Sequence, residues 1–495
     1  MASRASYLAL VGLVLTLVTP SFLAPYVNAE GLQPWSGTTS YPVHVYLERC
    51  VSYSAHVYCI GGNNGTNDIN SVYYAALGSS GVSSWIPTTS YPTTIDYAAC
   101  VADSGYVYCV GGSNYSGAYF NEVYYAPISS GGALGPWQPT TSYPSFGYGQ
   151  SCVPYSGYIY CVGGYDGGFT NAVYFAPMSS SGVGTWQPTT SYPFNISFQS
   201  CVVYSGDIYC VAGDDNGVTA VNATNYVYYA PVTLSGVGAW QRSTDYPMNI
   251  TDEECVVNSG YVYCIGGYSG GTLDVGEHYN VYYATLSPTG IGTWQSSTSY
   301  PVAVVGHSCV SELEQVYCIA GSTNTLDDVV YYSKFLSSTA TSVSCSESNV
   351  SYGAPVTCTA VVKGVNATGT VAWNANNTSS FNPAYCTLLS GNCSATYTAS
   401  GSGVTMITAK YSGDSSNSPS SGTIILQVSG SSSSVISKET NNTTSSFSSS
   451  EHCSNCGSGP GPLTIYILIV AAVLVVTGSA VGILRRRRVF NKSLP

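Results

Sequence analysis

The chain has 495 residues, of which 13% are aromatic and only 7% charged, and its formal net charge at pH 7 is −12. All 24 acidic residues lie within residues 30–451, where only six residues are basic, so this part carries a surplus of 18 negative charges. Such a surplus argues against nucleic acid or an anionic membrane surface as its partner.

Residues 1–29 have the pattern of a signal peptide. Arg4 precedes an apolar run over residues 7–18, and small residues then lead to a cleavage point after Ala29. The alternative, an N-terminal membrane anchor, is weaker because the apolar run is too short to cross a bilayer. We therefore predict that the mature chain is exported.

Six copies of one pattern, Trp-x5-Tyr-Pro-x7-Cys-x8-Cys, organise residues 30–337 with no change in internal spacing. After each second cysteine come an apolar residue, then Gly or Ala, then Gly, and a loop leads to a strand-like segment such as residues 123–126. A period of about 50 residues with these cues predicts four strands per repeat, as in the blade of a β-propeller. The copies begin at Trp35, Trp85, Trp137, Trp186, Trp240 and Trp294.

The spacing of each cysteine pair predicts a tight hairpin closed by a disulfide. In four copies Ser-Gly stands at the centre, as at Ser205-Gly206, where a two-residue primed turn is favoured. Counting outward, Cys201 faces Cys210 at a non-hydrogen-bonded position, where Cα atoms approach to about 4.5 Å, within disulfide range. Metal binding is the alternative, but structural zinc sites use closer pairs and the copies bring no His. The predicted pairs are Cys50–Cys59, Cys100–Cys109, Cys152–Cys161, Cys201–Cys210, Cys255–Cys264 and Cys309–Cys318.

The two ends of the repeat region complement each other. It begins with a fourth strand, within residues 34–42, and its last copy stops after a third strand, within residues 329–336. Pairing these two segments would close a ring and remove the exposed sheet edges. We therefore predict six blades.

The paired glycines after the second strand, as at Gly111-Gly112, followed by aromatic residues and then a Trp, resemble the kelch repeat. This resemblance implies a kelch-like propeller, a fold that serves adhesion proteins, scaffolds, receptor modules and a few enzymes, so it does not decide function. The paired cysteines depart from many relatives and point to an oxidising compartment.

Nearly all length variation between copies falls in the loop after the second cysteine, and variable loops on a rigid scaffold often build binding sites. Carboxylates in these loops and before the first strands, with Tyr nearby, could bind Ca²⁺, another cation or a carbohydrate. The alternative is that Asp and Asn are simply good loop formers. The candidate ligand-binding residues are Asp68, Asp166, Asp214, Asp215, Asp252, Glu253, Glu254, Asp274, Glu277, Asp327, Asp328, Tyr115, Tyr165 and Tyr268; Asp96, Tyr119 and Tyr279 lie in the same connections.

Residues 342–429 predict a β-sandwich from short alternating strands and turn residues. Gly369-Thr370-Val371-Ala372-Trp373 and Tyr411-Ser412-Gly413-Asp414 resemble the bacterial-type Ig-like repeats of surface proteins, which implies a stalk or adhesion module. Local pairing of Cys345 with Cys358 and Cys386 with Cys393 is expected, although four cysteines allow three connectivities.

The last segments predict a membrane anchor. Residues 430–462 are rich in Ser, Thr and Asn and form a flexible spacer, in which Cys453 and Cys456 suggest a small or interchain disulfide. Residues 463–484 are apolar or small and long enough for one transmembrane helix, and the basic residues 485–488 place the tail, 485–495, in the cytoplasm. We therefore predict a single-pass type I membrane protein with an extracellular ectodomain.

Asn-x-Ser/Thr sequons are frequent, as expected of a surface glycoprotein. Together with the prokaryotic-type Ig-like domain they suggest an archaeal cell surface. The sequons begin at Asn64, Asn114, Asn195, Asn222, Asn249, Asn349, Asn366, Asn376, Asn377, Asn392, Asn441 and Asn442.

The predicted fold class is all-β, with a six-bladed kelch-like propeller, an Ig-like sandwich and a single C-terminal transmembrane helix. The leading hypothesis is a cell-surface glycoprotein whose head recognises a surface glycan or protein. The alternatives are a structural component of a surface layer or cell envelope, packed against other envelope proteins, and an extracellular enzyme that acts on carbohydrates or oxidises an alcohol.

The enzyme hypothesis is the weakest of the three, and we predict no catalytic residue, no resident metal and no cofactor other than Ca²⁺. Only His44, His278 and His307 lie in connections where they could converge on a copper or zinc ion. A glycosidase would need only two of the loop carboxylates at a working separation.

Overall fold

The computed structural model describes residues 31–215, 223–270, 276–323, 325–377 and 380–430. Regular structure in these residues is all β-strand, and within them no helix is long and apolar enough to cross a membrane. The predicted signal peptide, the spacer beyond residue 430, the transmembrane segment and the basic tail lie outside the described residues. So do Asp274, Cys453, Cys456, Asn222, Asn441 and Asn442.

Each of the six repeats forms one antiparallel sheet, and in the first five the strands follow one another in chain order. The first strands carry the first cysteine of each pair: β2 (Arg49–Tyr53), β7 (Ala99–Asp103), β11 (Ser151–Tyr155), β16 (Ser200–Tyr204), β21 (Glu254–Asn258) and β26 (Ser308–Glu312). The second strands carry the second cysteine: β3 (His56–Ile60), β8 (Tyr106–Val110), β12 (Tyr158–Val162), β17 (Asp207–Val211), β22 (Tyr261–Ile265) and β27 (Gln315–Ser322).

The outer part of each sheet is a long third strand and a two-residue fourth strand. The third strands are β4 (Val72–Gly78), β9 (Val123–Pro127), β13 (Val173–Ser179), β18 (Val227–Thr233), β23 (Val281–Ser287) and β28 (Leu326–Lys334). The fourth strands are β1 (Ser36–Gly37), β6 (Ile86–Pro87), β10 (Gln138–Pro139), β15 (Gln187–Pro188), β20 (Gln241–Arg242) and β25 (Gln295–Ser296). Four repeats add a short strand that pairs with the end of the third one: β5 (Gly81–Val82), β14 (Gly182–Val183), β19 (Gly236–Val237) and β24 (Gly290–Ile291).

The hairpin between the first two strands has the register that the cysteine spacing predicts. In the fourth repeat Cys201 lies opposite Cys210 and Tyr204 opposite Asp207. Both residues of the Ser205-Gly206 turn have positive φ, 51° and 91°, as a type I′ turn requires. Six disulfides join the predicted pairs, with Cα atoms 4.0 to 4.1 Å apart.

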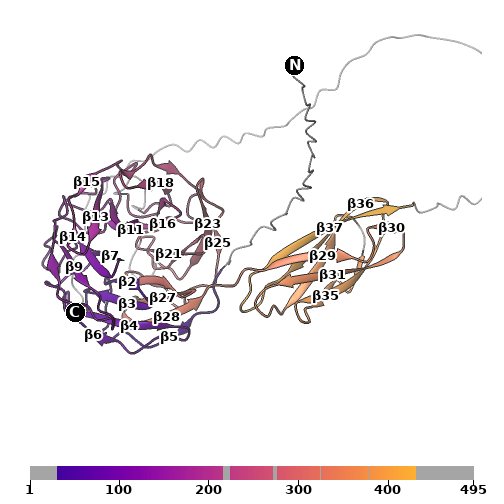
Figure 1. Ribbon diagram of the computed structural model, residues 1–495, viewed down its shortest axis with the longest axis horizontal. Coiled ribbons are helices and arrows are strands. Elements are labelled where there is room, and N and C mark those ends of the chain that lie inside the picture. Colours follow the sequence, from indigo (N-terminus) through magenta and orange to yellow (C-terminus); the bar gives the residue numbers. More distant parts are fainter. Residues whose placement is uncertain (1–30, 216–222, 271–275, 324, 378–379, 431–495) are drawn as a thin grey trace, which may run out of the picture. The chain divides into compact units, whose positions relative to one another are not determined.

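The sheets lie around a common centre, with their first strands on the inside (Figure 1). First strands of successive repeats contact each other, and β26 of the sixth repeat contacts β2 of the first. β1, from the start of the described chain, pairs with β28 of the sixth repeat, with Ser36 opposite Tyr332. The N-terminal segment therefore supplies the fourth strand of the last sheet, as the complementary ends of the repeat region predict.

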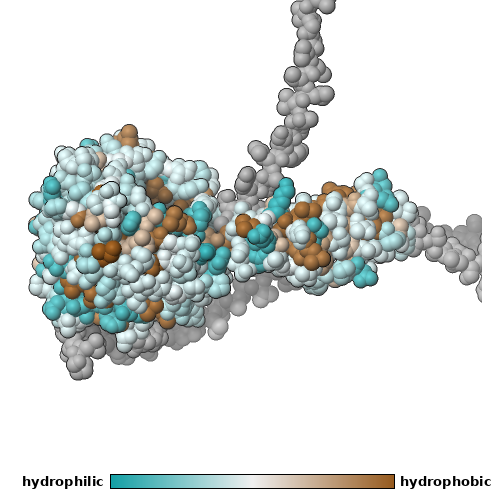
Figure 2. Space-filling model, turned by 60° about the horizontal axis from the view of Figure 1, so that its bottom comes forward, coloured by the Kyte–Doolittle hydropathy of each residue, from teal (hydrophilic) through white to brown (hydrophobic). Residues whose placement is uncertain are grey.

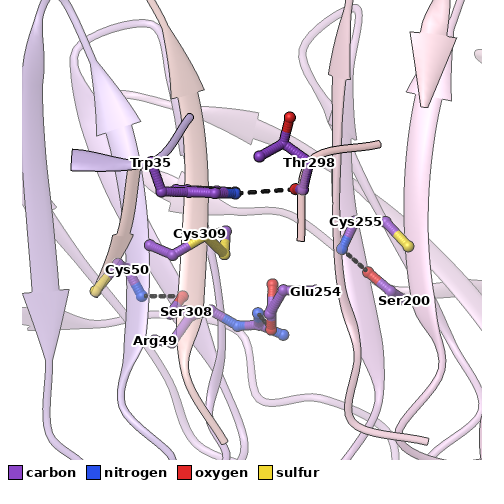
Figure 3. Close-up of a disulfide and its surroundings, with 10 residues drawn as sticks. Trp35, Arg49, Cys50, Ser200, Glu254, Cys255, Thr298, Ser308 and Cys309 are labelled. Atoms are coloured by element: carbon purple, nitrogen blue, oxygen red, sulfur yellow. Dashed lines mark hydrogen bonds and ion pairs between the residues drawn. A yellow bond between two sulfur atoms is a disulfide. The ribbon is translucent and has the colours of Figure 1, made fainter. Parts of the chain in front are cut away.

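Hydrophobic cores fill the space between neighbouring sheets. One core joins residues of the first and sixth repeats, among them Val57 and Val330, in the same way that others join consecutive repeats. The Trp of each repeat donates its Nε1–H to a threonine carbonyl of the preceding repeat, and Trp35 donates to Thr298 of the sixth repeat at 3.2 Å (Figure 3). Tyr300 of that repeat stacks edge-on against Trp35, with ring centroids 4.9 Å apart.

The second part of the described chain is a sandwich of two sheets, ordered β29-β31-β35-β33 and β30-β37-β36-β32-β34. Its strands are β29 (Ala340–Cys345), β30 (Asn349–Ser351), β31 (Pro355–Lys363), β32 (Thr370–Ala375), β33 (Ser380–Asn382), β34 (Tyr385–Thr387), β35 (Asn392–Thr398), β36 (Gly403–Tyr411) and β37 (Ser420–Ser429). The predicted pairs are both present: Cys345–Cys358 joins two strands of one sheet, and Cys386–Cys393 joins the two sheets.

The face seen in Figure 2 is mostly neutral in hydropathy, with smaller hydrophobic and hydrophilic areas side by side. This agrees with a chain in which few residues are charged and polarity comes from hydroxyl and amide groups.

Candidate functional site

The connections that enter the first strands meet at the centre of the six repeats. The residue three positions before each first cysteine has positive φ in every repeat, and we call these six residues the inner ring: Leu47, Tyr97, Gly149, Phe198, Asp252 and Gly306. Backbone hydrogen bonds link neighbouring members, for example from the N–H of Leu47 to the carbonyl of Gly306 at 2.7 Å and from Phe198 to Gly149 at 2.8 Å. The left-handed conformation thus turns the chain so that neighbouring repeats bond to one another around the centre.

The next position in each connection carries a buried side chain that packs against the preceding repeat. Gln150 donates its Nε2–H to the carbonyl of Val110 at 3.0 Å, and Gln199 donates to Val162 at 2.8 Å. The equivalent residues of the other repeats are Glu48, Ala98, Glu253 and His307. The side chains of Glu48, Glu253 and His307 are at most 4% exposed.

In three repeats the residue directly before the first cysteine is a serine that joins neighbouring first strands through a hydrogen bond. Ser308 Oγ accepts the N–H of Cys50 at 2.9 Å, and Ser200 Oγ accepts that of Cys255 at 3.0 Å (Figure 3). In the first and fifth repeats this position holds Arg49 and Glu254, which form an ion pair of 2.5 Å between Nη1 and Oε1. These repeats are not neighbours, so the ion pair spans part of the centre.

A cavity with a volume of about 60 Å³ lies among these connections, and we call it the central cavity. All six repeats contribute to its lining, which includes Glu48, Arg49, Tyr97, Phe198 and Asp252. Its polar lining residues also include Glu253, Glu254 and His307.

Burial shifts the pKa values of the titratable side chains that line this cavity. It raises the pKa of Asp252 to about 7 and the pKa of Glu48 and Glu253 well above the ordinary value. The pKa of Glu254 is raised by burial, an effect that Arg49 opposes. Burial lowers the pKa of His307 to about 3, so this imidazole is neutral at pH 7.

Aromatic rings form a second feature on the same face. Six partly exposed rings from three successive repeats lie in contact, with centroid separations of 5.2 to 5.8 Å. We call this set the aromatic surface: Tyr97, Tyr119, Tyr148, Tyr165, Phe169 and Phe198. Two of these rings, Tyr97 and Phe198, also line the central cavity, so the two features are continuous.

Several predicted site residues accept hydrogen bonds that stabilise the loops around them. Asp68 is 5% exposed and accepts hydrogen bonds from Asn63 Nδ2 and from the N–H of Tyr115, in the next repeat. Asp166 accepts the hydroxyl of Ser145 at 2.9 Å, and Asp327 accepts the N–H groups of Asp328 and Val329. For Asp68 and Asp327 the loop-forming interpretation therefore fits better than a role in binding.

The remaining predicted residues separate into two groups. Asp252, Glu253 and Glu254 meet at the central cavity, and Tyr165 belongs to the aromatic surface. Asp214, Tyr268 and Glu277 form isolated antiparallel β-bridges between loop segments. Asp215 is buried. Oδ1 of Asp328 lies 4.0 Å from Nδ1 of His44. Tyr115 is 44% exposed to solvent.

Metal-binding geometry among the described residues is limited to one group of three side chains, His307, Cys309 and Cys318. The two cysteines are joined in a disulfide and so are not free ligands. His44, His278 and His307 do not form such a group within the part of the chain that the structure covers.

Comparison with known proteins identifies the second part of the described chain. Residues 343–429 match the model of the bacterial Ig-like domain (group 3) family, so this chain carries a domain of that class. No curated protein matches the chain. Among solved structures, that of YjhT is similar, with 14% sequence identity and a TM-score of 0.48, covering 59% of this chain and 95% of that one.

Sequence reasoning missed Glu48, Tyr97, Tyr148 and Phe198 as site residues. A usable signal was present, because the distance to the following cysteine is constant. Aligning the six copies on that cysteine places Glu48 with Glu253, and Tyr97 with Phe198 and Asp252.

Proposed function

We propose that this chain is a membrane-anchored cell-surface glycoprotein whose six repeats form a closed six-bladed kelch-type propeller, and that this head binds an extracellular glycan. The closed ring is supported by three contacts between the first and sixth repeats: β1 with β28, Trp35 with Thr298, and Leu47 with Gly306. A closed ring needs no further strand to satisfy its edges, which suits an exposed head.

The aromatic surface is the observation that carries the binding proposal. Aromatic rings present flat apolar faces, and a sugar ring has apolar faces edged by hydroxyl groups, so partly exposed rings beside polar groups suit a carbohydrate. Asp96 lies next to Tyr97 in the chain, and Asp166 next to Tyr165, so carboxylate acceptors for sugar hydroxyls are close to the rings.

The anchor and the stalk rest on sequence and on the family match. Residues 343–429 match a bacterial Ig-like domain, which would serve as the stalk, and the apolar segment at 463–484 would hold the chain in a membrane. A rigid head displayed away from the membrane is the arrangement that an adhesin or receptor needs.

The test is a binding screen with the full-length chain in detergent, against a glycan array and against cell-surface extracts, with Tyr119→Ala and Tyr165→Ala as variants. Each ring contributes about 0.5–1.5 kcal/mol through stacking, so removing both should weaken glycan binding by roughly fivefold to a hundredfold. Tyr385→Ala, an exposed tyrosine of the Ig-like domain (70% exposed), is the matched control.

Two outcomes would contradict the proposal. Binding that survives both substitutions would place the ligand elsewhere on the molecule. Absence of glycan binding, with ordered self-association of the purified chain, would favour the alternative of a structural envelope component.

A further inference from the structure

Carboxyl groups outnumber basic groups in the lining of the central cavity. Four carboxyl groups line it, those of Glu48, Asp252, Glu253 and Glu254, and its basic side chains are Arg49 and the neutral His307. The guanidinium of Arg49 forms an ion pair with Glu254 and also lowers the pKa of Glu48 and of Asp252 electrostatically. Three carboxyl groups thus form no ion pair among the residues that line the cavity.

Two of these groups are also poorly satisfied. Both carboxyl oxygens of Glu48 and of Glu253 are buried and accept no side-chain hydrogen bond, and only backbone N–H groups, those of Glu48, Glu253 and Ser200, interact with them. Burying a carboxyl group with so few partners is costly, because it has lost water and gained little in return. The cavity must therefore either keep these groups protonated or receive a partner for them.

The geometry distinguishes between two kinds of cationic partner. A metal ion needs several oxygen ligands within about 2.6 Å of its centre, so their mutual distances are short. Within the part of the chain that the structure describes, no three of these carboxyl groups bring their oxygens within 4.8 Å of one another. An ammonium group tolerates longer separations, and it also interacts with the faces of aromatic rings.

Such rings are present at the cavity. Tyr97 and Phe198 line it together with Asp252, and their centroids are 5.2 Å apart. All three belong to the inner ring and have positive φ. Two aromatic rings beside a carboxyl group that forms no ion pair are the kind of surroundings in which organic cations are bound.

We propose that the central cavity binds a primary ammonium group, carried by an amino sugar of the recognised glycan, with Asp252 as counter-ion and Tyr97 and Phe198 as aromatic walls. This inference rests on the proposed glycan-binding function and specifies its ligand. The adjoining rings of the aromatic surface would hold the neighbouring sugar units.

Binding of this kind depends on pH. The carboxyl of Asp252 faces Asp214, Glu254 and Arg49 and is followed in the chain by Glu253, and Tyr97 lies close to it. Because its pKa is about 7, Asp252 is only partly ionised at neutral pH, and a bound ammonium would favour the ionised form. A proton and the ammonium ligand therefore compete for the carboxylate of Asp252. Affinity for the ammonium ligand should fall as the pH decreases below about 7.

The experiment measures binding of the full-length chain in detergent to glucosamine oligomers and to N-acetylglucosamine oligomers of equal length, at constant salt. The two probes differ in the ammonium group, which acetylation removes. We expect the glucosamine oligomer to bind roughly tenfold more tightly, the difference expected for one desolvated charge contact. Asp252→Asn should abolish this preference, whereas Asp103→Asn, which removes a charge from the opposite end of a first strand, should preserve it.

A second variant keeps the test valid if the first one fails to fold. Phe198→Leu keeps an apolar side chain but removes the ring, and it should reduce the preference for glucosamine several-fold without loss of thermal stability. A peptide with free lysine and its acetyl-lysine form provide the other source of an ammonium group. Binding of the free-lysine peptide alone would support the ammonium site but overturn the glycan function.

The remaining outcomes separate the two proposals. Equal binding of both oligomers, reduced by Tyr119→Ala, would overturn the ammonium site and keep the glycan function. Binding of neither oligomer and neither peptide would overturn both.

Discussion

Gln150 and Gln199, the two glutamines that lie two positions before a first cysteine, each pack against a left-handed glycine of the preceding repeat. A methyl group placed on Gly111 would lie 2.9 Å from Nε2 of Gln150, and one on Gly163 would lie 3.1 Å from Nε2 of Gln199. Glycine at these positions thus leaves the room in which the glutamine amide reaches its carbonyl partner.

The two repeats with glutamate instead of glutamine differ at this contact. Where Glu48 and Glu253 stand, the equivalent residues of the preceding repeats are Ala320 and Ala212, with φ of 50° and 51°. The alanine methyl occupies space that the glutamine amide uses elsewhere, and a carboxylate has no N–H group to donate to a carbonyl, so these glutamates make no comparable hydrogen bond.

A paired substitution tests this explanation. Ala212→Gly alone should raise stability by about 1 kcal/mol, because a left-handed conformation costs alanine about that much. Glu253→Gln in the same chain should add a hydrogen bond to the carbonyl of Val211, by analogy with Gln199. Thermal unfolding of the two single variants and the double variant measures this. Additive effects would show that the methyl group and the glutamate side chain are independent.

The raised pKa values also predict how stability depends on pH. A carboxyl whose folded-state pKa is about 7, as for Asp252, holds its proton where the unfolded chain has lost it at about pH 4. Its contribution is thus complete below about pH 4 and is lost as the pH rises through 7. Glu48 and Glu253 act in the same direction. The melting temperature of the repeats should therefore decrease from acidic to neutral pH, and less steeply in Asp252→Asn. A flat profile in the unsubstituted chain would contradict these pKa shifts.

At the scale of single elements, the first strands are joined by serine hydroxyl groups as well as by packing. Ser308→Ala should leave the buried N–H of Cys50 without its acceptor, which costs about 1–3 kcal/mol. Ser200→Ala should cost a similar amount, because Cys255 has the same environment. The second repeat holds Ala99 at this position, so Ala99→Ser is the reverse control and should stabilise. Equal melting temperatures for all of these chains would show that the hydroxyl groups contribute nothing.

In the Ig-like domain, the turn between β36 and β37 is organised by Asp414. Its carboxylate accepts the N–H groups of Thr368 and Ser416, each at 2.8 Å, and the hydroxyl of Tyr411 at 3.0 Å. These hydrogen bonds hold the pKa of Asp414 well below its usual range, although desolvation opposes them.

The consequence for this domain is opposite in sign to that for the repeats. Because the folded-state pKa of Asp414 is lowered, its contribution is complete above the unfolded pKa of about 4 and is lost as the pH falls below it. Asp414→Asn should lower the unfolding temperature of this domain at pH 7, and the difference from the unsubstituted chain should shrink near pH 2. Calorimetry that resolves the two unfolding transitions would measure both trends.

At the scale of the whole molecule, the closed ring that we propose depends on the segment before the first repeat. Trp35→Ala removes a hydrogen bond to Thr298 and the stacking with Tyr300, both of which join the two ends of the repeat region. Trp137→Ala removes the same contacts between the consecutive second and third repeats. In a closed ring both variants should lower the melting temperature by similar amounts. A much smaller effect of Trp35→Ala would indicate that the ring opens without cost.

The hairpins, their register and the disulfides could be predicted from the sequence because the relevant contacts are local. Eight residues between two cysteines and a Ser-Gly turn leave one tight hairpin, and Cys201 then faces Cys210 by counting alone. The complementary ends likewise predicted the pairing of β1 with β28. The short strands such as β5 were missed, since a two-residue hairpin arm has no periodicity of its own.

The sequence by itself determined which residues are structural, since Trp, Tyr-Pro and the cysteines recur at fixed intervals in every repeat. It could not determine what the non-recurring residues do together. Arg49 and Glu254 are an ion pair, and Tyr97 and Phe198 are neighbours, only because six repeats bring their inner residues to one centre. Contacts between residues more than 100 positions apart depend on how the sheets are arranged in space, and local patterning does not encode that distance. The central cavity, with its surplus of buried carboxyl groups, is therefore a property of the tertiary structure alone.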